Sequence, residues 1–259
     1  MDWDKELYNF NEKPLDRLCD GYSNTSIFRK IGFIGDSLSS GEFETRSPDG
    51  TRGYHDFYEY SWGQYIARKN GLTAYNFSKG GMTAKEYCES FAEEKGFWAP
   101  ELACQAYVIA LGVNEHFRDH EIGTSDDVDV ENYRNNKETT AGFYGQIISR
   151  YKEISPEAKF FFVTLPNDDR LNEEKRVTFE KVLYDFTEKF DNSYVIDLYK
   201  YGPVYDDNFR QHFYLHGHLD PSGYILTARL IDAYIDYIVR HNPDDFHHTG
   251  LVLSDVTDR

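Results

Sequence analysis

Residues 30–39 read KIGFIGDSLS, a short apolar segment followed at once by a turn containing glycine, aspartate and serine. The apolar part, Lys30–Gly35, is continuous rather than alternating, which is typical of a strand covered on both faces of a parallel sheet. A turn just past such a strand is a place where a nucleophilic serine can be exposed, with its backbone N–H facing a developing oxyanion. Taken alone, the turn has a second interpretation, because serine also caps helices.

Four further short segments rich in apolar, β-branched and aromatic residues predict strands: 73–77, 106–111, 159–164 and 193–197. Helical patterns lie between them. Ser61-x-x-Gln64 and Thr83-x-x-Glu86 have the form of capping boxes, and the first of these helices is expected to stop at Gly71. Apolar stripes at helical spacing run through residues 179–190 and 224–238. Regular alternation of strands and helices predicts an α/β/α sandwich with right-handed crossovers.

Two long segments interrupt this alternation. Residues 41–60 follow the first strand and residues 118–140 follow the third. Both leave the carboxyl ends of predicted strands, where open α/β sheets bind their ligands. Loops of this length are often lids or binding loops, so we expect them to border the site. We expect residues 1–259 to form a single domain, with its core at about 28–240 and extensions at both ends.

The charge and the apolar content limit the classes of partner. The formal net charge is −17, which repels nucleic-acid phosphates and anionic lipid headgroups, so neither partner is expected. No run of 18 apolar residues is present, and the charged N-terminus has no apolar signal segment. These features predict an intracellular, cytoplasmic protein. Its three cysteines, Cys19, Cys88 and Cys104, are expected to be reduced structural thiols.

Three more motifs stand beside predicted elements. Residues 76–83 (NFSKGGMT) follow the second strand, and a glycine there lets a backbone N–H approach a ligand closely. Residues 112–115 (GVNE) follow the third strand, where the Asn114 amide can donate to an oxyanion. Residues 218–224 (HLDPSGY) precede the last helix and place His218 near the end of the first strand. Separately, each motif is also explained by an ordinary turn glycine, a loop asparagine or a surface histidine.

Together and in this order, the four motifs resemble those of the SGNH/GDSL hydrolase superfamily, over residues 30–240. The resemblance implies a flavodoxin-like three-layer fold with about five parallel strands, and hydrolysis of an ester, thioester or amide through an acyl-enzyme, without cofactor or metal. Among these substrates, small acyl esters are our first hypothesis. It implies that Ser37 is the nucleophile and His218 the general base. It also implies an oxyanion hole formed by the N–H groups of Ser37 and Gly81 and by the Asn114 side chain. Acyl transfer to another acceptor would use the same residues. The oligomeric state stays open between monomer and homodimer.

The sequence departs from the family pattern at two positions. Glu115 replaces the aspartate that usually follows the asparagine. More seriously, Leu215 occupies the position three residues before the histidine, where the family has its triad aspartate. A backbone carbonyl near Leu215 is our first candidate for orienting His218, which would leave a Ser–His dyad. Alternatives are an acid from elsewhere, such as Asp206, Asp207 or Asp220, and an impaired enzyme. A catalytically inactive binding module is therefore the second functional hypothesis.

Two remaining features bear on ligands. His212, His216 and His218 make a zinc site conceivable, but a zinc-bound His218 would be lost as a base for Ser37. An aromatic cluster, by contrast, favours a sugar-like or compact acyl substrate, because aromatic faces stack on such groups. Its members are Tyr54, Phe57, Tyr58, Tyr60 and Trp62. Burial of these side chains in the core would remove that support.

Overall fold

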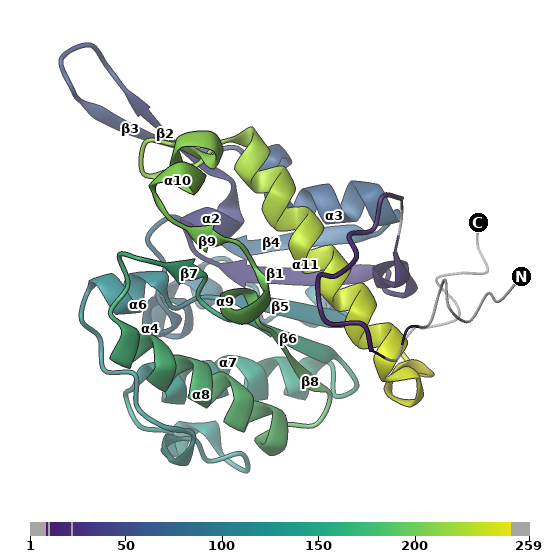
Figure 1. Cartoon of the computed structure of the whole chain (residues 1–259). Helices are drawn as coiled ribbons and strands as arrows, with labels where there is room; N and C mark the ends of the chain where they lie inside the picture. The colour runs from purple at the N-terminus through teal and green to yellow at the C-terminus, as the bar shows by residue number, and fades with distance from the viewer. Residues whose placement is uncertain (1–8, 10, 22, 250–259) are drawn as a thin grey trace, which may run out of the picture.

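The structure is a computed structural model that describes residues 9, 11–21 and 23–249. All five predicted strands are present, within one residue of their expected ends, and they form one parallel sheet in the order β4-β1-β5-β6-β8. Their bounds are β1 Lys30–Gly35, β4 Thr73–Ser78, β5 Ala106–Ala110, β6 Lys159–Val163 and β8 Ser193–Ile196. The predicted three-layer α/β/α architecture is confirmed (Figure 1).

Helices cover both faces of this sheet, and each face has its own hydrophobic core. On one face, α3 (Trp62–Asn70) and α11 (Pro221–His241) pack over β1, and the core includes Phe33, Trp62 and Ile235. On the other face, α7 (Thr140–Ile154) and α8 (Glu173–Lys189) enclose a core that includes Tyr144 and Phe162. Burial on both sides explains why the three central strands, β1, β5 and β6, are nearly continuous apolar runs.

The remaining elements are short. The helices are α2 Ser37–Ser40, α4 Ala84–Glu86, α5 Ala92–Glu94, α6 Val113–Phe117, α9 Leu198–Tyr201 and α10 Asp207–Phe213. The strand pairs are β2 Glu42–Arg46 with β3 Arg52–Asp56, β7 Asn167–Asp168 with β9 Val204–Tyr205, and β10 Tyr214–Leu215 with β11 His218–Leu219. One π-helical turn, Tyr87–Phe91, joins α4 to α5, and 3-10 turns occupy Asn24–Ile27, Tyr58–Tyr60, Pro100–Leu102, Ser125–Asp127, Tyr133–Asn135 and Pro243–Phe246.

The predicted helix signals are found where expected. The Ser61 side chain accepts a hydrogen bond from Gln64 N–H at the start of α3, and α3 ends at Gly71 in the left-handed conformation. Thr83 and Glu86 form a complete capping box at the start of α4. These caps satisfy backbone N–H groups that a helix leaves without partners at its first turn.

The expectation of irregular chain over residues 41–60 is wrong. Strands β2 and β3 form an antiparallel hairpin there, which projects beyond the sheet beside α10 (Figure 1). Residues 118–139 are irregular apart from two 3-10 turns, and residue 140 is the first of α7. Of the two expected extensions, residues 1–8, 10, 22 and 250–259 lie outside the described residues.

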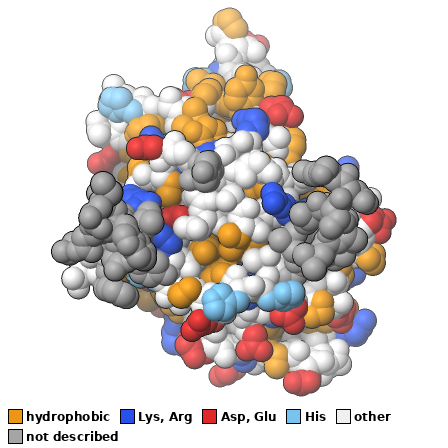
Figure 2. All heavy atoms as spheres, turned by 90° about the vertical axis from the view of Figure 1, so that its right-hand side faces the viewer, with side chains coloured by type: hydrophobic (Ala, Val, Ile, Leu, Met, Phe, Trp, Pro, Cys, Tyr) orange, Lys and Arg blue, Asp and Glu red, His pale blue; other side chains and the backbone are white. Residues whose placement is uncertain are grey.

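All three cysteines are buried free thiols, in agreement with the expectation of structural cysteines. On the face drawn in Figure 2, acidic and basic side chains are interspersed with small hydrophobic groups. None of the helices in the described ranges combines the length and the apolar character of a membrane span.

Candidate active site

Ser37 is the first residue of α2, directly after β1. The Asp36 side chain caps this helix by accepting a hydrogen bond from Leu38 N–H at 3.0 Å. Ser37 itself is half-buried. Its N–H group is at the first helical position, which has no intrahelical acceptor, and it donates to no described residue. The turn therefore presents a hydroxyl and a free backbone donor together at the carboxyl edge of the sheet.

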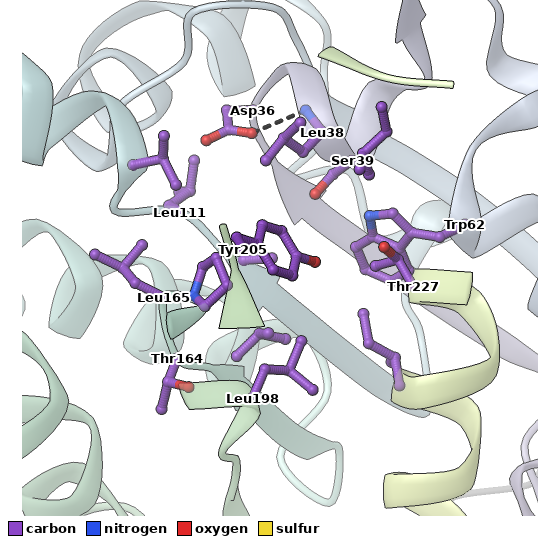
Figure 3. Close-up of a pocket in the computed structure, with 16 residues that line it drawn as sticks. Asp36, Leu38, Ser39, Trp62, Leu111, Thr164, Leu165, Leu198, Tyr205 and Thr227 are labelled. Atoms are coloured by element: carbon purple, nitrogen blue, oxygen red, sulfur yellow. Dashed lines mark hydrogen bonds between the residues drawn. The ribbon is translucent and has the colours of Figure 1, made fainter. Parts of the chain in front are cut away.

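A small cavity of about 60 Å³ lies beside this turn. Figure 3 shows Asp36, Leu38 and Ser39 on one side of it and the apolar side chains of Leu111, Leu165 and Leu198 around it. Ser37 is not among the lining residues. Burial is the main cause that raises the pKa of Asp36 to about 7, and the nearby charges of Glu115 and Glu42 add to it. The Leu38 N–H and His218 oppose this rise.

The raised pKa of Asp36 predicts a specific stability profile for Asp36→Asn. The Asp36 carboxyl has a pKa of 3.8 in the unfolded chain and about 7 in the folded protein. As the pH rises between these values, the wild type loses stability, whereas Asp36→Asn, which has no ionisable group at this position, does not. The unfolding free energy of the variant, relative to wild type, should rise by roughly 4 kcal/mol from pH 4 to pH 8. Any cost from altered hydrogen bonds is a constant offset. Urea unfolding across this range measures the difference, and a pH-independent difference would contradict the prediction.

Asn114 contacts both the Asp36 side chain before the Ser37 turn and the carbonyl of Met82, the residue that follows Gly81. Gly81 has a φ of 73°, and its N–H donates to no described residue. The Asn114 amide donates to the Met82 carbonyl at 3.1 Å and lies 3.4 Å from Asp36 Oδ2. The second contact is long, so a bound anion could replace it at modest cost. The structure thus brings the first three motifs together, although Asn114 is already engaged.

His218 reaches this edge from β11 and lies among carboxylates. Its Nε2 is 3.0 Å from Glu42 Oε1, and its Nδ1 is 3.7 Å from Glu44 Oε2. Burial opposes protonation of the imidazole, but the hydrogen bond and charge of Glu42, with the charges of Glu44 and Asp36, outweigh it and raise the pKa of His218. Ser37 Oγ makes no hydrogen bond to a described residue, so Glu42 and not Ser37 is the Nε2 partner here.

The acids expected near His218 are engaged elsewhere. Asp206 caps α10 and Asp220 caps α11 through their side chains, while Asp207 pairs with Arg210. The first candidate, a backbone carbonyl near Leu215, is not found either. Leu215 pairs with His218 in the β10–β11 ladder, but His218 Nδ1 has no hydrogen-bond partner within the described residues. The Glu44 contact at 3.7 Å is an ion-pair distance, so it is longer than a hydrogen bond.

The three neighbouring histidines are not grouped. His212 Nδ1 lies 2.7 Å from the Asn208 carbonyl within α10, and His216 is exposed in the turn between β10 and β11. In the described ranges, no three His, Cys, Asp or Glu side chains gather in a way that could hold a metal ion.

Sequence analysis missed Glu42, Glu44 and the approach of Tyr54 to His218. The ring centroids of Tyr54 and His218 are 5.7 Å apart, and Tyr54 is 51% exposed. Glu42, Glu44 and Arg46 are spaced two residues apart, as on one face of a strand. The segment is so polar, however, that this spacing did not identify it as a strand. In the aromatic cluster, Phe57 and Tyr60 are also exposed, whereas Trp62 is buried in the core.

Comparisons with known proteins show the family of this chain. A family model described as GDSL-like lipase/acylhydrolase matches residues 33–226. No curated protein gives a significant match to this chain.

Solved structures share the fold at low sequence identity. A family 3 carbohydrate esterase from Clostridium thermocellum is 15% identical, with a TM-score of 0.54 over 82% of this chain and 98% of that chain. A family two carbohydrate esterase from the same organism, in complex with cellohexaose, is 16% identical, with a TM-score of 0.54 over 90% of this chain and 66% of that chain. A carbohydrate esterase family 2 enzyme with a carbohydrate binding domain, from Corynascus thermopiles, is 15% identical, with a TM-score of 0.54 over 82% of this chain and 66% of that chain.

Proposed function

Because the chain belongs to the GDSL-like lipase/acylhydrolase family, we propose that it hydrolyses short acyl esters through an acyl-enzyme on Ser37. The observation that carries the proposal is the arrangement around the α2 turn. A half-buried serine with a free N–H stands at the carboxyl edge of the sheet, where Asn114 lies beside Asp36. Gly81, with its own free N–H, precedes the Met82 carbonyl that Asn114 contacts.

The chemistry follows from these groups. Ser37 Oγ attacks the ester carbonyl carbon while His218 Nε2 takes the hydroxyl proton. The negative charge moves to the carbonyl oxygen, where the Ser37 and Gly81 N–H groups and the Asn114 amide stabilise it. The bond to the alcohol oxygen then breaks, and His218 returns the proton to that oxygen. Water, activated by the same imidazole, attacks the acyl-enzyme and releases the acid.

One contact must change before this sequence can begin. In the structure, His218 Nε2 lies 3.0 Å from Glu42 Oε1. The imidazole must exchange Glu42 for Ser37 before it can accept the serine proton. Small shifts of this kind are common on substrate binding, because catalytic hydrogen bonds tighten only in the complex.

For the substrate, we favour short acyl groups, such as acetyl, carried on a carbohydrate or another small metabolite. The exposed rings of Tyr54, Phe57 and Tyr60 are available to stack on a sugar face, and Tyr54 adjoins the base. The similarity in fold to carbohydrate esterases is consistent with this choice.

A series of p-nitrophenyl esters, from acetate to octanoate, tests the proposal. We expect the highest kcat/KM with acetate and a fall with chain length, together with labelling of Ser37 by a fluorophosphonate. Adding alcohol acceptors separates hydrolysis from acyl transfer, because a transferase would convert the acyl group to a new ester. Absence of both turnover and labelling would reject the proposal and favour a binding module.

Asn114→Ala should lower kcat by about 10²–10³-fold with little change in KM, because one donor to the oxyanion is lost only in the transition state. Asn208→Ala, an exposed asparagine on α10, is the matched control and should retain wild-type rates. Steady-state kinetics on the acetate ester measures both. A change confined to KM would remove Asn114 from the oxyanion hole.

A further inference from the structure

The imidazole of His218 lies between two carboxylates from the same strand. Glu42 and Glu44 are two residues apart on β2, so both side chains project from the same face of the hairpin. Glu42 faces Nε2 and Glu44 faces Nδ1. A serine hydrolase needs its nucleophile at one ring nitrogen and an orienting acceptor at the other. With Leu215 in the usual acid position, the acceptor has to come from outside the local motif.

Glu44 is held in a site built for a carboxylate. Its side chain is only 2% exposed, and Oε1 lies 3.2 Å from Arg46 Nε and 3.6 Å from Arg52 Nε. Oε2 accepts a hydrogen bond from Gly217 N–H at 2.9 Å. Although burial acts in the opposite direction, the two arginines and the Gly217 N–H lower the pKa of Glu44. The carboxylate is therefore ionised beside the histidine.

Gly217 is what allows this close approach. A Cβ atom at residue 217 would be 2.4 Å from Glu44 Oε2, well inside van der Waals contact. The residue that precedes His218 thus binds Glu44 through its N–H and leaves space for it by having no side chain. The same Oε2 atom faces His218 Nδ1, for which no described residue supplies a hydrogen bond.

Glu42 does not fit the same role. It occupies Nε2, the nitrogen that the proposed mechanism requires for Ser37. A Cβ atom at residue 80 would be 2.2 Å from Glu42 Oε2. Residue 80 directly precedes Gly81, the candidate oxyanion glycine. Glu42 therefore lies on the side of the ring where the substrate must react, whereas Glu44 lies on the opposite side.

We propose that Glu44 is the positioning residue of His218, taking the part of the acid that the family pattern places at position 215. This inference rests on the proposed function. Anchored by Arg46, Arg52 and Gly217, Glu44 fixes the ring with Nδ1 protonated, so that the lone pair of Nε2 is directed toward Ser37. When Nε2 takes the serine proton, the imidazolium attracts Glu44, and the 3.7 Å contact shortens to a hydrogen bond.

The experiment compares Glu44→Gln, Glu44→Asp and Glu42→Gln with Glu59→Gln, an exposed glutamate paired with Arg68. Gln at position 44 keeps the size but not the charge, and should lower kcat at least tenfold and up to ~10³-fold, with a smaller effect on KM. Asp keeps the charge at a greater distance and should retain more activity than Gln. Glu42→Gln should cost less than Glu44→Gln, and Glu59→Gln should match wild type.

A pH profile separates positioning from a purely structural role. The charged and titratable groups that face His218 are Glu42 and Glu44 on β2, Tyr54 on β3 and Asp36 before α2, with Arg46 and Arg52 acting on Glu44. Removing the charge of Glu44 should lower the pKa of His218, which shifts the acidic limb of kcat/KM to lower pH. Titration of the His218 ring by NMR, assigned with His218→Asn, should show the same fall without any substrate.

Gly217→Ala provides a second test that leaves the carboxylate intact. The added methyl should displace Glu44 and lower kcat in the same way, even if Glu44→Gln proves unstable. The inference is overturned if Glu44→Gln behaves like Glu59→Gln, or if Glu42→Gln costs more activity. Ser37→Ala distinguishes the two failures. Full activity in Ser37→Ala rejects the proposed function itself. If Ser37→Ala is inactive but Glu44→Gln is as active as wild type, only the role of Glu44 is rejected.

Discussion

Ser37→Ala is expected to abolish ester hydrolysis, with kcat reduced by about 10⁴–10⁶-fold relative to wild type. The hydroxyl is the only group that the mechanism asks to form a covalent bond. Without it, the oxyanion donors and the substrate contacts remain, and they give only the small residual rate over water that such sites retain. The fold should survive, because Ser37 Oγ makes no hydrogen bond to a described residue and the cap of α2 is supplied by Asp36.

Ser39→Ala is the matched control for this experiment. Ser39 lies in the same short helix, but its hydroxyl is buried and has no hydrogen-bond partner within the described residues. Removing it should leave turnover intact and should not destabilise the protein. Steady-state rates on p-nitrophenyl acetate, together with fluorophosphonate labelling of both variants, provide the comparison. If Ser37→Ala retains wild-type turnover, another residue is the nucleophile.

His218→Asn should reduce kcat/KM by about 10³–10⁵-fold, because the serine hydroxyl is a weak nucleophile without a base to take its proton. The loss should be accompanied by a change in pH dependence. The base must be neutral to act, and nearby carboxylates raise the pKa of His218 above its ordinary 6.5. In wild type, kcat/KM should therefore rise with pH along a limb centred above 6.5, and the variant should lack this limb.

The matched control for His218 is His216→Asn. His216 is exposed in the two-residue turn before β11 and has a φ of 60°, which asparagine tolerates better than most residues. The variant should fold and retain the wild-type pH profile. Rates measured from pH 5 to 9 give the comparison. An unchanged acidic limb in His218→Asn would show that another group sets the pH dependence.

The sequence by itself determined the elements whose signals are local. Short segments rich in apolar, β-branched and aromatic residues predicted all five strands of the sheet, and the three central strands are nearly continuous apolar runs because a strand buried on both faces has no polar side. Ser61, Gly71 and Thr83 marked helix ends correctly, since caps involve residues only a few positions apart. The same locality applies to the candidate site. Ser37, Gly81 and Asn114 each follow a strand of one parallel sheet, so their convergence at its carboxyl edge was predictable.

What only the tertiary structure decided is the surroundings of His218. The contact between Glu44 and Gly217 joins residues 173 positions apart, and no periodicity in the chain relates them. The hairpin that carries Glu42 and Glu44 is largely polar, with Phe43 packed into the core, so it lacks the apolar alternation by which strands are recognised. Nearby acids such as Asp206 and Asp220 were better candidates by sequence distance, yet they cap helices. Sequence distance is a poor guide here, because the partner of a buried charge is set by which elements fold against it.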